Sequence, residues 1–252
     1  MTSELKLIGI GAGNPEWVTV AAARAIGELD VLFVVIKEKD LDEFVEVRRQ
    51  IVSEHRSTPL RTVELHDPPR PWRSTPDYPA AVRTWRAQRL QQWSDAVASE
   101  LGEGQVGGFL VWGDPSLYES TLAIVKELVA VCSRDIRIQV IPGISSVLAL
   151  AAAHQIPLNR QGRAFVIEPA RLLASGMPDG TDDVVAMLDG HQTFAHIDPT
   201  GLDIYWGAYL GTGDEILISG DLESVREEIL RVRAEAAHRK GWIFDTYLLR
   251  RR

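Results

Sequence analysis

Short apolar runs alternate with longer amphipathic segments through the first 155 residues of the chain. The apolar runs predict strands at residues 5–10, 31–36, 63–65, 108–112 and 136–141. The segments that follow them carry apolar residues at helical spacing and predict helices at residues 19–29, 41–55, 79–101, 116–131 and 145–154. Repeated strand–helix units of this kind predict an α/β fold with a doubly wound, mainly parallel sheet.

The pattern of elements changes after residues 156–162, Ile-Pro-Leu-Asn-Arg-Gln-Gly. Beyond them we predict one helix at 222–237 and strands at 164–168, 183–188, 203–210, 215–219 and 242–249. We therefore expect an N-terminal α/β domain over residues 1–155, a linker at 156–162 and a C-terminal mixed α/β domain over 163–252. The three arginines at 250–252 are expected to form a free tail.

One segment of the first half fits neither pattern. Residues 66–79 contain five prolines, which forbid a helix and discourage the interior of a sheet. A long irregular loop in a compact domain is usually functional or disordered. Its Arg70, Trp72, Arg73 and Tyr78 favour a lid that faces a substrate, while a disordered loop is the alternative.

The composition is that of a globular protein, with 252 residues of which 45% are hydrophobic and 25% charged. A net charge of −8 argues against a nucleic-acid partner. The single cysteine, Cys132, excludes an internal disulfide and a multi-cysteine zinc site. The sequence has neither an apolar run near the ~18 residues of a membrane span nor a secretory signal. We therefore expect a cytoplasmic protein without a membrane partner.

Three predicted strands end in loops marked by glycine, at residues 9–13 (Gly-Ile-Gly-Ala-Gly), 112–115 (Trp-Gly-Asp-Pro) and 142–146 (Pro-Gly-Ile-Ser-Ser). The carboxyl ends of parallel strands meet at one edge of a sheet, where α/β proteins bind ligands. Each glycine could instead serve a tight turn, and Ser145 or Ser146 could simply cap a helix. The three loops together nevertheless favour a ligand site.

The spacing of the first loop argues against a dinucleotide. Gly9, Gly11 and Gly13 read G-x-G-x-G, whereas the dinucleotide fingerprint is G-x-G-x-x-G. The second strand ends in Lys37 and Glu38 rather than in an acidic residue alone, and the chain lacks a Gly-Lys-Ser or Gly-Lys-Thr phosphate loop. A dinucleotide-dependent oxidoreductase is therefore a weaker alternative, as is a ligand-binding module without catalytic activity.

The order and spacing of these loops resemble the tetrapyrrole (precorrin and uroporphyrinogen) methyltransferases over essentially the whole chain. The resemblance implies two α/β domains, S-adenosylmethionine in the cleft between them and a homodimer. The first loop, the strand end at 33–37 and the segment from Asp67 to Arg89 are most similar to members that methylate precorrin-5 at C-1, release acetate and give precorrin-6A. Methylation of another precorrin, or of another substrate such as RNA, is the alternative within this chemistry.

The resemblance also implies roles for individual residues of this sequence. For the cofactor it implies Ala12, Trp112, Gly113, Asp114, Leu117, Ser145, Ser146, Leu188, Gly207 and Ala208. For the carboxylate-rich substrate we select Lys37, Arg70, Arg73, Tyr78 and Arg89, because arginines bind carboxylates bidentately. Asp114 could instead brace its own loop, and Leu188 could be ordinary core.

The release of acetate calls for a general base, because water must attack the acetyl carbonyl. The candidates are Glu38, Asp114, Tyr118, His154 and His196, and the sequence does not rank them. His191 and His196 would need a further ligand to hold a metal, so we expect none.

Overall fold

The computed structural model describes residues 2–36, 42–69 and 77–252 of the chain. The chain divides into two compact units. The first comprises Met1–Gly11 and Pro15–Ile144, and the second comprises Ala12–Asn14 and Ser145–Arg252. The division at Ile144 lies ahead of the linker expected at 156–162, because the helix at 146–153 packs on strands of the second unit.

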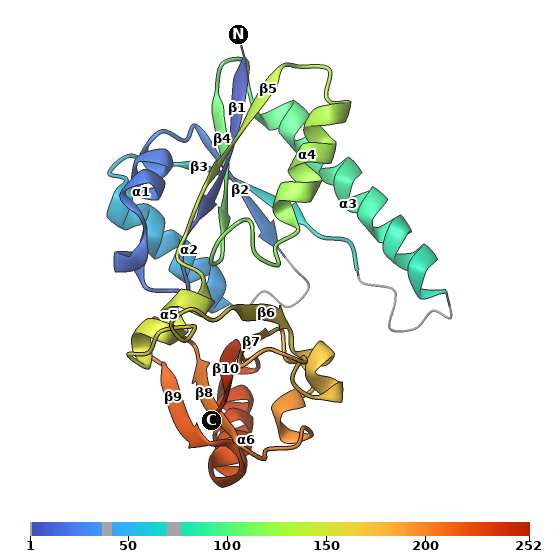
Figure 1. The fold of residues 1–252 in the computed structure, drawn as a ribbon. Helices are drawn as coiled ribbons and strands as arrows, with labels where there is room; N and C mark the ends of the chain where they lie inside the picture. The colour runs from blue at the N-terminus through green and yellow to red at the C-terminus, as the bar shows by residue number, and fades with distance from the viewer. Residues whose placement is uncertain (1, 37–41, 70–76) are drawn as a thin grey trace. The chain divides into compact units, whose positions relative to one another are not determined.

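The described part of the first unit forms a parallel sheet of five strands in the order β3-β2-β4-β1-β5 (Figure 1). Its strands are β1 (Ser3–Gly9), β2 (Val31–Ile36), β3 (Arg61–His66), β4 (Val106–Val111) and β5 (Ile136–Ile141). In register, Gly9 lies beside Val111 of β4, and Ile8 lies beside Ile141 of β5. The expected parallel sheet is confirmed.

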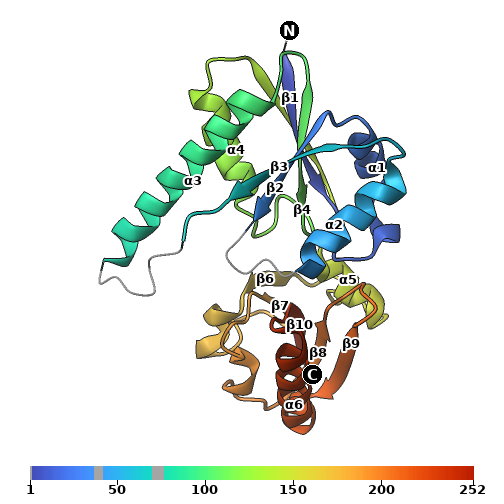
Figure 2. The ribbon, with the colours of Figure 1, turned by 180° about the vertical axis from the view of Figure 1, so that it is seen from behind.

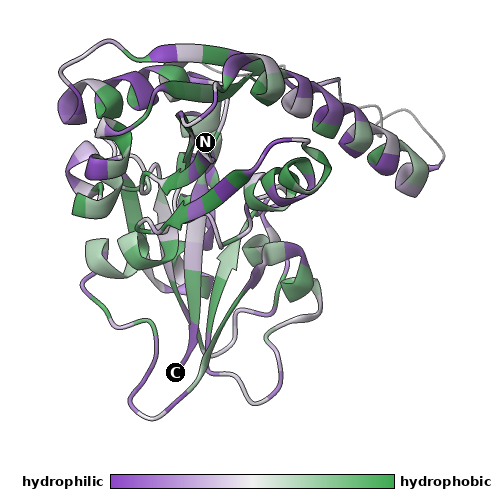
Figure 3. Cartoon of the chain, turned by 90° about the horizontal axis from the view of Figure 1, so that it is seen from above, coloured by the Kyte–Doolittle hydropathy of each residue, from purple (hydrophilic) through white to green (hydrophobic). Residues whose placement is uncertain are grey.

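The helices of the first unit lie on both faces of this sheet (Figures 1 and 2). The helices α1 (Val20–Gly27) and α2 (Asp42–His55) lie on one face, and α3 (Tyr78–Glu100) and α4 (Thr121–Val131) lie on the other. The core on the α1 side includes Ile8, Ile26 and Ile51, and the core on the α3 side includes Leu7, Trp93 and Leu128. In Figure 3, hydrophobic residues concentrate on the strands, while α3 carries hydrophilic residues along much of its length.

The strands β1 and β4 are neighbours, yet the helices that follow them lie on opposite faces of the sheet. The chain leaves β1 through a short 3-10 turn, η1 (Pro15–Trp17), toward α1, and it leaves β4 toward α4. Ligands of open α/β sheets bind in the crevice that this divergence opens at the carboxyl ends of the strands. The topology therefore favours a ligand at the loops that follow β1 and β4.

The described part of the second unit contains a mixed sheet of five strands in the order β6-β7-β10-β8-β9. Its strands are β6 (Phe165–Pro169), β7 (Asp183–Met187), β8 (Leu202–Ala208), β9 (Ile216–Asp221) and β10 (Asp245–Arg251), with 3-10 turns η3 (Ala170–Ser175) and η4 (Thr193–Ala195). Only β6 and β7 are paired in parallel in this sheet, as far as the described residues show. The helix α5 (Ser146–Ala153) packs on β8 and β10, and α6 (Leu222–Lys240) packs on β8 and β9 (Figure 2).

Two local expectations are wrong. The helix expected at 116–131 begins at Thr121, because Tyr118 adopts a left-handed conformation with φ of +52°. The carboxylate of Glu119 then accepts hydrogen bonds from the N–H groups of Ser120 and Thr121. The expected tail is not free: Arg250 and Arg251 belong to β10, Arg250 forms an ion pair with the buried Asp183, and Arg252 pairs with Asp203 and Asp221.

Within the described ranges, each helix is too short or too polar to cross a membrane.

Candidate functional site

Three strand ends of the first unit meet at a junction of glycines. Gly9 ends β1, Gly113 lies just after β4, and Gly143 lies just after β5. A side chain on Gly9 would lie 2.5 Å from the nitrogen of Gly143, and one on Gly143 would lie 2.1 Å from the oxygen of Gly113. Both distances are too short for a Cβ, so the three main chains are in direct contact, and Gly9 and Gly143 require glycine.

Main-chain hydrogen bonds join the first two loops above this junction. The N–H of Gly113 donates to the carbonyl of Gly11 at 2.8 Å, and the N–H of Gly11 donates to the carbonyl of Gly113 at 3.3 Å. The φ values of Gly11 and Gly113 are +79° and +64°, which glycine adopts without steric cost. The prediction that the loops lie at one edge of the sheet is confirmed.

Asp114 links the loop after β4 to the turn after β5. Its Oδ1 accepts a hydrogen bond from the N–H of Ser116 at 2.8 Å, and its Oδ2 accepts one from the N–H of Gly143 at 3.0 Å. Burial raises the pKa of Asp114, but the hydrogen bonds from Ser116 and Gly143 outweigh this effect and leave the pKa below its usual value. Its carboxylate is therefore ionised and engaged, as the bracing alternative expected, and it is a weak candidate for a general base.

The other predicted residues of the first two loops lie around the same edge. Trp112 follows β4 directly and is half-buried, and Leu117 donates its N–H to the carbonyl of Asp114 at 3.2 Å. Tyr118 is 44% exposed beyond them. Ala12, half-buried between two glycines, groups with the second unit.

A second set of predicted cofactor residues lies at one edge of the second sheet. Because β7 and β8 both run antiparallel to β10, their carboxyl ends share this edge. Gly207 pairs with Thr246, whose Oγ1 lies 3.4 Å from the Oγ of Ser146 at the start of α5. Ala208 is fully buried, main chain included, so its expected contact with the cofactor rests on the resemblance alone.

The start of α5 does not use the side chain of its N-cap serine. Ser145 occupies the N-cap position, yet within the described residues its side chain forms no capping hydrogen bond. It is 9% exposed. The alternative that the Ser145 hydroxyl caps the helix is therefore not supported by the described hydrogen bonds.

Leu188 follows β7 in a left-handed conformation with φ of +59° and is 63% exposed. This conformation costs a residue other than glycine about 1–3 kcal/mol, and such strain clusters at functional sites. The alternative that Leu188 is ordinary core is therefore wrong. The next residue, Asp189, is 4% exposed, and its carboxylate accepts hydrogen bonds from Thr193 and Tyr247.

The structure corrects the expectation for Arg89. Its guanidinium is buried between Trp85 and Trp93, with its carbon 5.2 and 4.5 Å from the two ring centroids. Its Nε donates to the carboxylate of Asp67 at 2.6 Å, and its Nη1 donates to Ser120 at 3.2 Å. Arg89 therefore anchors the start of the proline-rich segment to α3 and is not placed to bind a substrate.

The remaining substrate candidates are unevenly described. Tyr78, at the start of α3, is 57% exposed. Lys37, Arg70 and Arg73 lie outside the described residues, as does the catalytic candidate Glu38.

Arg48 lies beside a predicted site residue, Trp112, a proximity that the sequence pattern does not reveal. It lies on α2 with its guanidinium carbon 5.7 Å from the centroid of the Trp112 ring, beside the loop of Gly113 and Asp114. In the sequence it appears only as one position of an amphipathic helix. The contact with Trp112 is the signal that places it near the site, and it depends on the tertiary fold.

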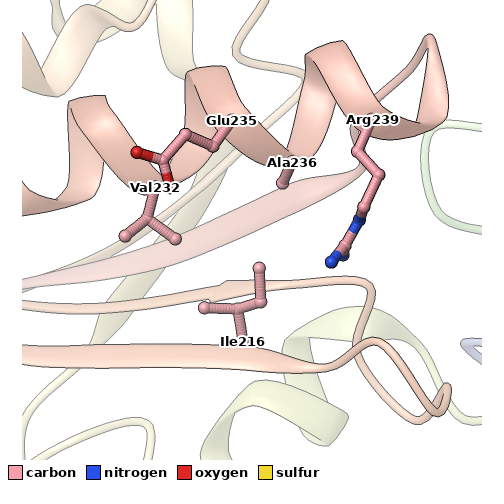
Figure 4. A pocket seen from close by; sticks show the side chains of 5 residues that line it. All are labelled: Ile216, Val232, Glu235, Ala236 and Arg239. Atoms are coloured by element: carbon pink, nitrogen blue, oxygen red, sulfur yellow. The ribbon is translucent and has the colours of Figure 1, made fainter.

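A pocket of about 160 Å³ lies elsewhere in the second unit, between β9 and α6 (Figure 4). It is lined by Ile216, Val232, Glu235, Ala236 and Arg239, none of which was predicted to be a site residue. Pockets that hold a cofactor-sized molecule usually measure about 300–1,000 Å³, so this one is too small for that purpose. Among the described residues, no group of three His, Cys, Asp or Glu side chains is arranged to hold a metal ion.

The model of the tetrapyrrole (corrin/porphyrin) methylases matches residues 4–226. The chain belongs to this family. Its sequence is 43% identical over 249 residues to a precorrin-6A synthase (deacetylating) of Sinorhizobium sp.. The aligned region covers 98% of this chain and 95% of the relative.

Two solved structures share the fold. A cobalamin synthesis related protein of Corynebacterium diphtheriae superposes with a TM-score of 0.85 at 30% identity, over 100% of this chain and 99% of that one. The uroporphyrin-III C-methyl transferase of Thermus thermophilus, complexed with S-adenosylhomocysteine, superposes with a TM-score of 0.55 at 18% identity, over 98% of this chain and 96% of that one. At this identity the second likeness concerns the fold alone.

Proposed function

We propose that this tetrapyrrole methylase transfers a methyl group from S-adenosylmethionine to C-1 of precorrin-5 and releases the acetyl group there as acetate, giving precorrin-6A. The observation that carries the proposal is the 43% identity to a precorrin-6A synthase over nearly the full length of both chains. The family match supports methylation of a tetrapyrrole, and the relative supplies the particular precorrin.

The loops of the first unit suit a cofactor without phosphate groups. Residues 10–15, 112–117 and 142–146 contain no lysine or arginine, the residues that usually bind phosphate. What they offer is main chain that a ligand can approach closely, because Gly11 and Gly113 carry no side chain. S-adenosylmethionine, when bound, supplies an activated methyl group on a positively charged sulfur.

In the second unit, the proposed contacts are the exposed side chain of Leu188, the main chain of Gly207 and Ala208, and the hydroxyls of Ser145 and Ser146. The carboxyl ends of β7 and β8 lie at the same edge of the sheet, and the start of α5 reaches this edge through the contact of Ser146 with Thr246. These groups bind and orient rather than exchange protons. Alignment of donor and acceptor can by itself supply several kcal/mol of the barrier reduction, about 7–11 in the best cases.

The proposed substrate carries several carboxylates, so its binding site needs positive charge, although the protein as a whole has a net charge of −8. We propose Arg48 as one source of this charge, because it lies over Trp112 at the loop of Asp114. Lys37, Arg70, Arg73 and Tyr78 remain proposed substrate contacts on the strength of the resemblance. For acetate release we retain Tyr118 and Glu38 as proposed general bases, since the Asp114 carboxylate is already held by Ser116 and Gly143.

The test is an incubation with precorrin-5 and methyl-labelled S-adenosylmethionine, followed by mass spectrometry of the tetrapyrrole and measurement of acetate. The expected result is one labelled methyl group and one acetate per turnover. Methylation without acetate would contradict the deacetylating function, and labelling of a different precorrin would replace the substrate. Calorimetry should show binding of S-adenosylhomocysteine and none of NAD(H), and the reverse would favour an oxidoreductase.

We also propose that the protein is a homodimer and that it works in the cytoplasm, as the resemblance to the family implies. Light scattering coupled to gel filtration should give twice the chain mass of 28.0 kDa. A mass equal to one chain would contradict the dimer.

A further inference from the structure

A buried polar network lies beneath the edge of the second sheet and centres on Arg233 of α6. Arg233 is 8% exposed. Its Nε donates to Oδ2 of Asp245 at 2.7 Å, and its Nη2 donates to the main-chain carbonyl of Asp189 at 2.8 Å. One guanidinium therefore bridges two strand ends, the residues after β7 and the first residue of β10.

Further side chains fix both ends of this bridge. The hydroxyl of Tyr247 donates to Oδ2 of Asp189 at 2.9 Å, and the N–H of Thr193 donates to the same oxygen at 2.7 Å. The indole N–H of Trp206 donates to Oδ2 of Asp245 at 3.0 Å. Buried polar networks that are satisfied in this way hold their members in one geometry.

Electrostatics make Arg233 the critical member. Burial raises the pKa of Asp245, and the hydrogen bond and charge of Arg233 oppose that rise. Burial also raises the pKa of Tyr247, and the charge of Asp189 raises it further, so the Tyr247 hydroxyl stays protonated and donates. Without Arg233, the Asp245 carboxylate would lose its buried cation and the Asp189 carbonyl would lose this donor.

Both ends of the bridge adjoin proposed cofactor contacts. Asp189 follows the exposed, left-handed Leu188, and Asp245 pairs with Ala208 in the register of β8 and β10. Arg233 donates hydrogen bonds to Asp189 and Asp245. It is therefore one residue removed from Leu188, through Asp189, and from Ala208, through Asp245. The guanidinium thus links the 187–189 turn to Asp245, the residue of β10 that pairs with Ala208.

We propose that Arg233 is a positioning residue for the cofactor, acting through Asp189 and Asp245 on Leu188 and Ala208; this rests on the proposed function. A purely structural role is the competing hypothesis. Arg250 provides a matched control, because it also pairs with a buried aspartate, Asp183, and is 12% exposed. That pair lies at the opposite end of β7.

The experiment compares Arg233→Met with Arg250→Met in the full chain. Both variants should lower the melting temperature, because each leaves a buried carboxylate without its cation. The dissociation constant of S-adenosylhomocysteine, measured well below both melting temperatures, should rise about tenfold or more for Arg233→Met and stay within about twofold for Arg250→Met. An equal effect of the two variants, or an unchanged constant for Arg233→Met, would overturn the proposal.

A milder variant and a ligand-free readout complete the test. Tyr247→Phe removes only one hydroxyl, and it should weaken cofactor binding by a smaller factor, while Arg233→Lys should recover part of the affinity lost in Arg233→Met. Amide hydrogen exchange without ligand should rise at residues 187–193 and 205–209 in Arg233→Met and not in Arg250→Met. If the wild-type chain does not bind S-adenosylhomocysteine, the proposed function fails, whereas unchanged exchange at these residues overturns the positioning role by itself.

Discussion

The carboxylate of Asp114 accepts a hydrogen bond from the N–H of Gly143 at 3.0 Å and so ties the loop after β4 to the turn after β5. Asp114→Ala should free both segments and weaken S-adenosylhomocysteine binding about 10–100-fold, the effect of losing hydrogen bonds to a charged group. Calorimetry checks the result. Asp114→Asn, which keeps one acceptor oxygen, should lose less.

The control for this prediction is Asp135→Ala. Asp135 is exposed ahead of β5, at the other end of the sheet, and accepts a hydrogen bond from Thr2. Its loss should leave the affinity unchanged. Equal weakening by Asp114→Ala and Asp135→Ala would show that Asp114 acts on general stability only.

The glycine junction predicts a severe effect of a single methyl group. Gly143→Ala would place a Cβ 2.1 Å from the oxygen of Gly113, and main chain cannot move aside as a flexible side chain can. We expect a loss of about 3 kcal/mol or more in the free energy of unfolding, measured by urea titration. Gly213→Ala, where a Cβ meets nothing within 4 Å, should change it by no more than ~0.5 kcal/mol. A Gly143→Ala protein as stable as this control would argue against the direct main-chain contact.

Arg89 should behave as an anchor and not as a substrate contact. Arg89→Met leaves the 5%-exposed Asp67 carboxylate without its partner, which typically costs about 3–5 kcal/mol of folding free energy. Arg86→Met, on the same helix with a half-exposed ion pair to Glu127, should cost no more than ~1 kcal/mol. Unfolding measurements separate the two. A stable Arg89→Met protein with a raised KM for the tetrapyrrole would restore Arg89 as a substrate contact.

Arg48 should affect the substrate and leave the cofactor alone. Arg48→Ala removes a cation beside Trp112, so the KM for the tetrapyrrole should rise about tenfold, since one charged contact accounts for roughly 1.4 kcal/mol or more. The affinity for S-adenosylhomocysteine should be unchanged. Its neighbour Arg49 is exposed and pairs with Glu46 on the same helix, so Arg49→Ala should alter neither quantity. An equal rise in KM for Arg49→Ala would show that the effect of Arg48→Ala comes from the loss of net positive charge and not from a contact with the substrate.

His154 should make the stability of the second unit depend on pH. Burial lowers its pKa below the usual 6.5, although the hydrogen bond with the Trp206 carbonyl and the charge of Glu215 act in the opposite direction. The unfolded chain therefore binds more protons than the folded one below pH 6.5, and the free energy of unfolding should fall as the pH is lowered through this range and be constant above it. Urea unfolding at a series of pH values measures the slope.

The variant that tests this assignment is His154→Gln, whose amide can still donate to the Trp206 carbonyl but does not titrate. The acid-side slope should decrease in His154→Gln and persist in His238→Gln, which alters an exposed histidine of α6. An unchanged slope in His154→Gln would assign the effect to other groups.

Most elements of the fold follow from the apolar pattern, because burial imposes it. Residues 31–36 form a continuous apolar run, and the strand has these bounds. The start of α4 was missed because it depends on the conformation of Tyr118 and the carboxylate of Glu119, which no periodicity reveals. The position of the last strand, β10, in the middle of its sheet is likewise a matter of pairing between distant segments.

The meeting of the glycine loops at one edge of the sheet was predictable from the sequence, whereas the surroundings of individual side chains were not. The loops at Gly9, Gly113 and Gly143 were found because glycine at the end of a strand usually serves a tight turn or a close approach of main chain. Arg89 was expected to contact the substrate, although its position in the helix already indicated burial. It shares a helical stripe, four residues from each neighbour, with Trp85 and Trp93, which indicates a buried face.

The glycine junction also limits how this scaffold can be altered. Because the main chains of Gly9, Gly113 and Gly143 are in mutual contact, a change in the length of one loop must be accommodated by the others. Grafting a single loop from a relative would therefore be expected to fail, whereas exchanging all three together would preserve their fit. The unit of redesign is the set of three loops.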